Sequence, residues 1–93
     1  MRSIRRTRTF KRDYKHEKKG RHQKTIADDL LKVVAMLAND EALARRHHDH
    51  SLAGEWNDHR DCHVRPDLVL IYRKGDENAI DLVRLGSHSE LGL

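Results

Sequence analysis

Five polar side chains in the second half of the chain are of the types that break an RNA phosphodiester: His50, His63, Asp67, Arg84 and His88. Attack of a 2′-hydroxyl on the adjacent phosphate needs a base, an acid for the departing 5′-oxygen, and positive charge on the phosphate. Histidine suits both proton roles because its ordinary pKa of about 6.5 lies near working pH. Arginine offers two parallel hydrogen bonds to phosphate oxygens. The set is therefore consistent with RNA cleavage, which on this scheme requires no metal.

Each of these residues also has a purely structural interpretation. A loop histidine such as His50 is commonly solvated, and Asp67 follows a proline in a position that often caps a turn. Arg84 alternates in step with the apolar Ile80 and Leu82 along the predicted strand, so its side chain would face the same side as theirs. It would then either lie over the core or pair with Asp81 or Asp61. The residue types alone leave these interpretations open.

The first half of the chain predicts a short strand and two helices. Ser3–Thr9 is basic with one large apolar side chain, which is typical of a weak edge strand, and Phe10–Arg21 is predicted as a cationic helix. Apolar residues then recur at helical spacing from Ile26 to about Asn39 and predict an amphipathic helix. Thr25, just before it, predicts a capping-box-like start.

The second half predicts antiparallel strands. Residues 40–54 are expected to be mostly loop, and from Trp56 the side chains alternate, with Cys62 facing inward. The proline after residue 65 predicts a turn, Leu68–Tyr72 a central strand buried on both faces, and Ala79–Leu85 a returning strand. Residues 86–93 are expected to form a tail. The expected class is α+β, with one strand, two helices and three antiparallel strands in a single domain over 1–93.

Positive charge is concentrated at the N-terminus. Residues 1–24 hold 11 Lys/Arg against two acidic residues, although the whole chain has a formal net charge of only +4. Such asymmetry indicates a polyanionic partner, bound with release of counterions. The single Cys62 excludes an intramolecular disulfide and fits a reducing compartment. Without an apolar run of signal or membrane-span length, we expect a cytoplasmic protein that does not contact membranes.

Three motifs in the second half occur in a specific order. They read DHSLAGEW over 49–56, RDCHVRPDLVLIY over 60–72 and RLGSH over 84–88. Their order and spacing resemble the YafQ branch of the RelE superfamily, in which D-H-x-L-x-G-x-W, R-D-x-H-x-x-P-D-W-x-L-I-Y and R-x-G-T/S-H recur. The opening Thr9–Asp13 is also similar, though less specific.

The resemblance implies a microbial-RNase-like fold in which the strands form one curved sheet. It implies a toxin of a type II toxin–antitoxin system that inhibits translation by cleaving mRNA in the ribosomal A site, leaves a 2′,3′-cyclic phosphate, and is neutralised by a cognate antitoxin. His50, His63, Asp67 and His88 become catalytic candidates, and Arg84 a candidate for binding the phosphate. His50 is favoured as base and His88 as acid, although these labels could be exchanged. Ribosomal RNA contacts are expected at Lys11, Lys15, Lys18, Lys19 and Arg21.

The chain departs from the family pattern at two places. Leu68 stands where the family often has tryptophan, and Gly92 where many members have an aromatic residue. Codon preference therefore cannot be carried over. One alternative is a non-catalytic toxin of the same fold, as in the gyrase-poisoning ParE branch, although that branch lacks the three histidines. Another alternative is a metal site among His47, His48, Asp49, His50, His59 and His63, which the single cysteine disfavours.

Overall fold

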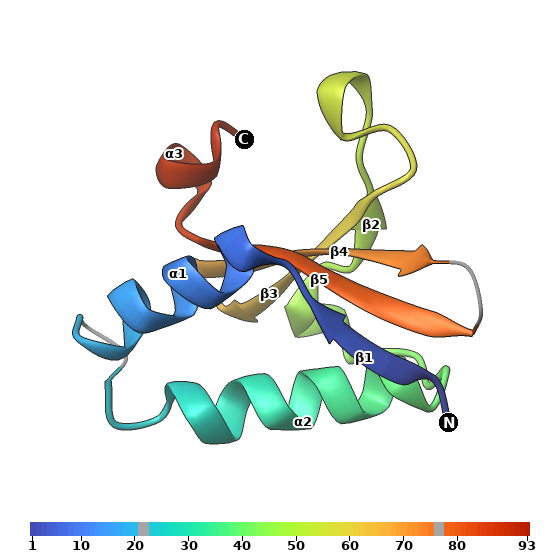
Figure 1. Ribbon diagram of the computed structural model, residues 1–93, viewed down its shortest axis with the longest axis horizontal. Helices are drawn as coiled ribbons and strands as arrows, with labels where there is room; N and C mark the ends of the chain where they lie inside the picture. The colour runs from blue at the N-terminus through green and yellow to red at the C-terminus, as the bar shows by residue number, and fades with distance from the viewer. Residues whose placement is uncertain (21–22, 76–77) are drawn as a thin grey trace.

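The computed structural model describes residues 1–20, 23–75 and 78–93 and has an α+β architecture (Figure 1). Three helices and five strands follow one another in the part of the chain that the structure describes. In order they are β1 (Ser3–Arg6), α1 (Arg8–Lys18), α2 (Ile26–Ala38), β2 (His50–Ser51), β3 (Arg60–Arg65), β4 (Leu68–Gly75), β5 (Ala79–Gly86) and α3 (His88–Leu91). Two short 3-10 turns, η1 (Arg45–His47) and η2 (Gly54–Trp56), flank β2.

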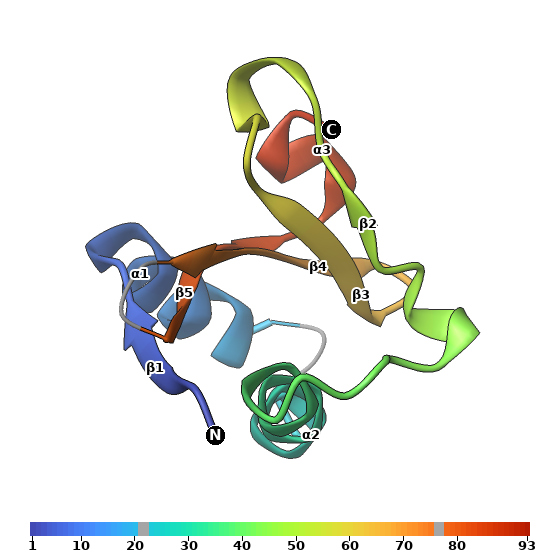
Figure 2. The same cartoon turned by 90° about the vertical axis from the view of Figure 1, so that its right-hand side faces the viewer.

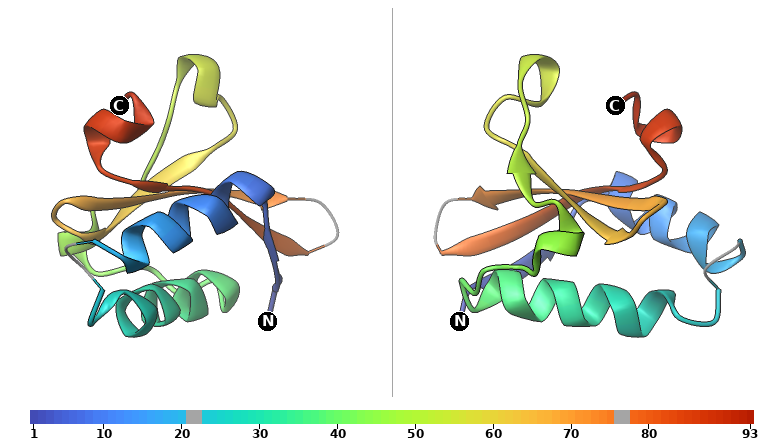
Figure 3. Two further views of the ribbon diagram at one scale, coloured as in Figure 1. Left: turned by 60° about the vertical axis from the view of Figure 1, so that its left-hand side comes forward. Right: turned by 180° about the vertical axis from the view of Figure 1, so that it is seen from behind.

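The strands form one sheet in the order β1-β5-β4-β3-β2. Consecutive strands β2 to β5 pair antiparallel, as the sequence predicts for the meander, whereas β1 pairs parallel to β5. The first strand of the chain therefore lies against the last. Figures 2 and 3 show the twist and curvature of this sheet, with β1 and β2 at its two edges.

The two faces of the sheet are covered differently. Helices α1 and α2 lie against one face and enclose the main core, whereas α3 and the segment from β2 to β3 rise from the other face (Figures 1 and 3). Successive side chains of β3 point to opposite faces of the sheet. Cys62 and Val64 join the main core, so Asp61 and His63 lie on the opposite face. A smaller apolar cluster on that face contains Val69, Ile71, Leu91, Leu52, Trp56 and Val83.

Helix α2 confirms the prediction from helical periodicity. It runs from Ile26 to Ala38 and buries the apolar stripe against the sheet. The predicted capping-box-like start is wrong, because the Thr25 side chain makes no cap hydrogen bond. It instead accepts a hydrogen bond from Arg65. Asp28 and Asp29 still lie in the first turn, at the positive end of the helix dipole.

Helix α1 begins two residues earlier and ends earlier than the predicted Phe10–Arg21. Its N-cap is Thr7, whose hydroxyl accepts a hydrogen bond from the backbone of Phe10 and donates one to the carbonyl of Val83. One side chain thus starts the helix and fixes it to β5. Arg21, the predicted end of the helix, lies outside the described residues.

Three expectations for the second half need correction. Trp56 does not begin a strand, since it belongs to η2 and β3 starts at Arg60. The loop before it contains the two-residue strand β2, and the expected tail contains α3. The turn at 66–67 and the strand over Leu68–Tyr72, buried on both faces, are confirmed. Among the described residues, no helix has both the length and the apolar character needed to cross a membrane.

Candidate active site

Three imidazoles from distant parts of the chain form a row on the face of the sheet opposite α1 and α2. The ring centroid of His63 lies 5.2 Å from that of His48 and 4.8 Å from that of His88. His63 projects from β3, His88 is the first residue of α3, and His48 ends η1 in a left-handed backbone conformation. We call these three residues the imidazole row. Figure 2 shows how α3 and the β2 region rise from this face of the sheet.

His50 joins the site through a buried carboxylate. Its Nε2 atom lies 3.0 Å from Oδ1 of Asp61, and its Nδ1 atom lies 2.8 Å from the carbonyl oxygen of His48. Asp61 is only 2% exposed, whereas the His50 side chain is 56% exposed. No described group donates a well-aligned hydrogen bond to that Oδ1 atom, and its contact with His50 is an ion pair only when the His50 ring is protonated.

The segment 45–51, which we call the histidine loop, is fixed to the sheet at two points. The Tyr72 hydroxyl donates a hydrogen bond of 2.6 Å to Asp49, and Arg60 also contacts that carboxylate, at 3.3 Å. Nδ1 of His47 lies 2.6 Å from the carbonyl oxygen of His63 and hydrogen-bonds to it. The loop is thereby held by a side chain of β4 and by the backbone of β3.

Helix α3 is short but well capped. Ser87 and Glu90 form a reciprocal capping box, and Gly92 ends the helix with a φ of 72°. Leu91 is 5% exposed and packs with the apolar residues of β4. These contacts fix the first turn of the helix, so the position of His88 beside His63 is set by packing and capping together.

Burial governs the electrostatics of the site. It lowers the pKa of His63, and nearby His88 lowers that pKa further, while Asp61 and a hydrogen bond to the backbone of Pro66 oppose the shift in part. Burial raises the pKa of Asp61, against the attraction of the His50, His63 and His88 rings. The site thus combines an imidazole biased toward its neutral form with a carboxyl group biased toward holding a proton.

The structure brings His50, His63 and His88 to one site but places the other two predicted residues differently. Asp67 is exposed in the turn between β3 and β4, four positions beyond His63. Arg84 is half-buried on β5 and binds Asp13 of α1 through Nε at 2.7 Å. Neither Asp81 nor Asp61, the partners considered from parity, is the ion-pair partner found for Arg84. The Asp13 carboxylate also accepts the backbone N–H of Leu85, which ties α1 to β5.

Sequence reasoning missed two members of the site. His48 was considered as a ligand of the alternative metal site and not as a catalytic candidate, yet its ring lies against His63. Asp61 had a detectable signal, because it shares the parity of His63 on β3 and was not assigned to the core face. His47, His48, Asp49, His50, His59 and His63, considered as a metal site, supply no three ligand atoms within 4.8 Å of one another in the described part of the chain.

Residues 2–92 match the model of a family described as bacterial toxins of type II toxin–antitoxin systems, YafQ. The chain belongs to the YafQ toxin family. A YafQ toxin of Haemophilus influenzae is 37% identical over 71 residues, which cover 73% of this chain and 70% of the relative. The mRNA interferase toxin YafQ of Escherichia coli K12 is 36% identical over 59 residues, 63% of each chain.

Solved structures of YafQ-like toxins share the whole fold. A metal-bound toxin from Helicobacter pylori superposes with a TM-score of 0.82 and 40% identity, covering 98% of this chain and 99% of the other. YafQ in the Escherichia coli DinJ–YafQ complex superposes with a TM-score of 0.80 and 30% identity, covering 98% of both chains. The RelE-type α+β fold expected from the motifs is therefore confirmed.

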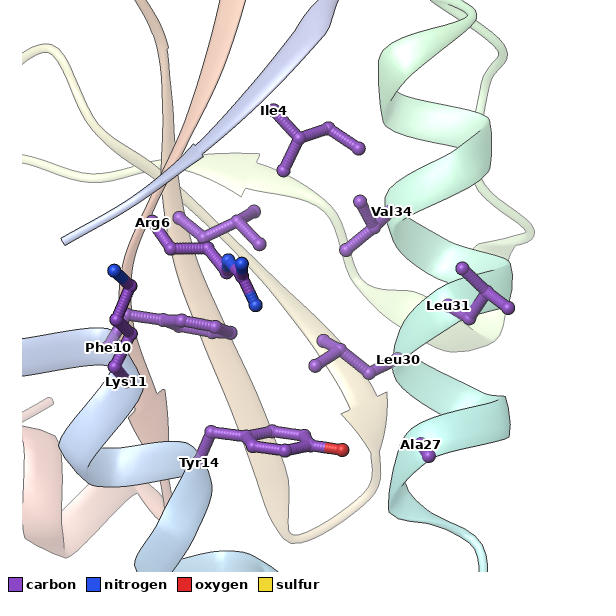
Figure 4. A pocket seen from close by; sticks show the side chains of 10 residues that line it. Ile4, Arg6, Phe10, Lys11, Tyr14, Ala27, Leu30, Leu31 and Val34 are labelled. Atoms are coloured by element: carbon purple, nitrogen blue, oxygen red, sulfur yellow. The ribbon is translucent and has the colours of Figure 1, made fainter.

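A groove on the opposite side of this YafQ-family chain is lined mainly by apolar residues (Figure 4). It has a volume of about 550 Å³ and lies between α1, the edge strand β1 and α2. Leu31 and Ile4, which are 66% and 44% exposed, stand at its border. Arg6 and Lys11 add positive charge. The groove and the imidazole row are lined by different residues.

The predicted RNA-binding lysines lie on or just after α1. Lys11, Lys15, Lys18 and Lys19 are all exposed, and the ammonium group of Lys18 lies 6.0 Å from the centre of the Tyr14 ring. Arg21, the fifth predicted contact, falls outside the described residues. The four lysines therefore present their charges to solvent.

Proposed function

We propose that this chain is a ribosome-dependent endoribonuclease that cleaves mRNA in the A site and thereby inhibits translation. The observation that carries the proposal is the approach of His63 to His88 and His48, which come from three separate segments. Two imidazoles about 5 Å apart can serve the two ends of one scissile phosphate. Membership of a toxin family that includes a named mRNA interferase supports the same activity.

In the proposed reaction, His63 is the base and His88 the acid. Burial and His88 lower the pKa of His63, so its ring is neutral near pH 7 and able to take the 2′-hydroxyl proton. The 2′-oxygen then bonds to phosphorus, the bond from phosphorus to the 5′-oxygen breaks, and His88 donates a proton to that oxygen. The products are a 2′,3′-cyclic phosphate and a 5′-hydroxyl, without a catalytic metal.

The assignment of His63 as base differs from the one favoured by family resemblance. Both ring nitrogens of His50 already face acceptors, one on Asp61 and one on the backbone of His48. His50 therefore has no nitrogen available for a 2′-hydroxyl in this arrangement. Asp67 is proposed to contact the substrate from the turn beside His63. Arg84 is proposed to approach the phosphate by exchanging its contact with Asp13.

Cleavage of a defined mRNA on programmed ribosomes, mapped by primer extension, tests the proposal. His63→Gln and His88→Gln should each reduce cleavage by about 10²–10⁴-fold, the usual contribution of a proton-transfer group. His16→Gln is the matched control, because His16 is exposed on α1 outside the imidazole row. Protein dialysed against a chelator should keep full activity when only the Mg²⁺ that ribosomes require is restored. Absence of cleavage by the wild type, or full cleavage by both variants, would refute the proposal.

The apolar groove is proposed to bind a cognate antitoxin. The Escherichia coli YafQ is found in a complex with DinJ, so a partner protein is expected for a member of the same family. Exposed Leu31 and Ile4 offer apolar surface, and Arg6 and Lys11 favour an acidic partner. We therefore expect an amphipathic segment with apolar and acidic residues. The lysines of α1 are proposed to contact ribosomal RNA.

A further inference from the structure

Two buried carboxylates on this protein differ in their partners. Asp61 and Asp81 are 2% and 6% exposed, and they are the buried charged residues found among the described ones. Asp81 receives hydrogen bonds from Arg5 and Arg73, so its charge is compensated. Asp61 has neither an arginine nor a lysine partner among its recorded contacts, and its Oδ1 atom lacks an aligned donor. A buried carboxylate in that condition reduces stability.

Among the described residues, the groups that bring positive charge to Asp61 when protonated are histidines. His50 approaches from β2, His63 from β3 and His88 from α3, while Asp49 is the acidic neighbour. On the adjacent strand, Ile71 is the register partner of Asp61, and Arg84 lies opposite Ile71 on β5 but is bound to Asp13. The charge of Asp61 therefore acts mainly on the imidazoles of the candidate active site.

The contact with His50 requires a proton. Nδ1 of His50 faces the carbonyl oxygen of His48 at 2.8 Å, so that nitrogen carries a hydrogen. In a neutral ring the other nitrogen, Nε2, would then present its lone pair to Asp61 Oδ1 at 3.0 Å, which is repulsive. One additional proton shared between His50 and Asp61 removes the repulsion.

We propose that Asp61 is a positioning residue that shares one proton with His50 and supplies the counter-charge that His63 and His88 face. This inference rests on the proposed nuclease function. Clustered imidazoles repel one another's protons, and without a buried anion they would all become neutral at a lower pH. The site would then retain its base but lose its proton donor near pH 7. Asp61 thus maintains a mixed protonation state, in which one ring accepts a proton while another donates one.

The pH dependence of single-turnover cleavage distinguishes this role from a structural one. In Asp61→Asn we expect the alkaline limb of the profile to move about one pH unit lower, so that cleavage falls about tenfold or more at pH 8 and recovers toward wild type near pH 6. Asp81→Asn is the matched control, and its profile should be unchanged at temperatures where it is folded. An Asp61→Asn profile that superimposes on that of the wild type would overturn the proposal.

Stability and ring spectra provide a readout without RNA. Asp61→Asn should melt at the wild-type temperature or above it, whereas Asp81→Asn should melt lower. Nitrogen-15 spectra of the free protein at pH 6.5 should show both nitrogens of His50 protonated in a larger fraction of wild type than of Asp61→Asn. Unchanged spectra would overturn the proton-sharing claim even if the wild type cleaves RNA. If the wild type does not cleave RNA, the proposed function fails while the spectra still decide this point. Asp61→Ser repeats the comparison if the asparagine variant does not fold.

Discussion

Replacing Tyr72 with phenylalanine removes a single hydroxyl that ties the histidine loop to the sheet. That hydroxyl donates to Asp49 at 2.6 Å and accepts from Arg60 at 3.3 Å, and Tyr72 is only 1% exposed. The ring itself stays in the main core, so packing should be preserved. The variant therefore removes two charge-assisted hydrogen bonds, one to Asp49 and one from Arg60, and little else.

The magnitude follows from the partners. A hydrogen bond to a charged group contributes about 1.5–3 kcal/mol. Water will compensate for part of the loss, because the Asp49 and Arg60 side chains are 26% and 39% exposed. We therefore expect Tyr72→Phe to lose about 1.5 kcal/mol of unfolding free energy. For a domain of this size, that corresponds to a fall in melting temperature of about 6–12 °C.

The effect on cleavage should exceed what the stability loss alone would cause. Asp49 lies between His48 and His50, so releasing it loosens the part of the loop that faces His63 and Asp61. A displacement of about 1 Å can reduce catalysis by about 100-fold. We expect kcat to fall by about tenfold at 20 °C, where the variant remains folded, with a smaller change in KM.

Calorimetry and cleavage on programmed ribosomes check this prediction together. Tyr14→Phe is the matched control, since it removes the same group from a half-buried tyrosine whose hydroxyl has no hydrogen bond recorded among the described residues. If Tyr72→Phe loses stability but cleaves at the wild-type rate, the hydroxyl does not position the histidine loop. If neither the melting temperature nor the cleavage rate changes, the two hydrogen bonds of the Tyr72 hydroxyl contribute nothing.

Three further predictions concern separate parts of the molecule. Lys15→Glu with Lys19→Glu should weaken ribosome binding and flatten its salt dependence without changing the melting temperature; equal binding in a sedimentation assay would contradict the proposed RNA contact. Leu31→Glu should weaken binding of the cognate antitoxin by about tenfold or more in calorimetric titration while leaving RNA cleavage intact, and undiminished antitoxin binding would exclude the groove. His63 should titrate by NMR below the usual value of about 6.5, and His88→Gln should raise its midpoint. Because folding lowers the pKa of His63, the stability that the neutral ring confers is present above pH 6.5 and is lost as pH falls through the lowered pKa. An NMR titration midpoint of His63 at or above 6.5 would show that burial does not act as described.

The long elements were predictable because their signals are local. The apolar stripe of α2 and the uninterrupted apolar run of Leu68–Tyr72 each lie within one segment, and the structure confirms both. The missed elements, β2 and α3, are only two and four residues long. Such short elements have no periodicity of their own. They exist because β2 pairs with β3 and because Leu91 packs onto β4.

The candidate site was predicted in part for the same reason. The order of the three motifs identified His50, His63 and His88 as candidates. Correct prediction of the antiparallel strands then implies that these residues lie close together. The partner of Arg84 was not predictable from parity, because Asp13 lies 71 positions away on α1. His48 was missed because its contact with His63 depends on a left-handed residue in a loop. Sequence patterns thus predicted which residues lie close together on one face of the sheet. They did not predict the ion pairs that join a strand to a helix.

The parallel pairing of β1 with β5 has a consequence for how the protein becomes active. Ser3 is the register partner of Ala79, so β1 has no strand to pair with until β5 has been made. β5 also occupies the position between β1 and β4, and the segment that follows it supplies His88. A chain that ends before residue 79 therefore lacks an interior strand, the docking place for its own N-terminus and one of the three imidazoles. The sheet and the imidazole row are therefore completed by the same segment, residues 79–88, so truncation upstream of it should remove both at once.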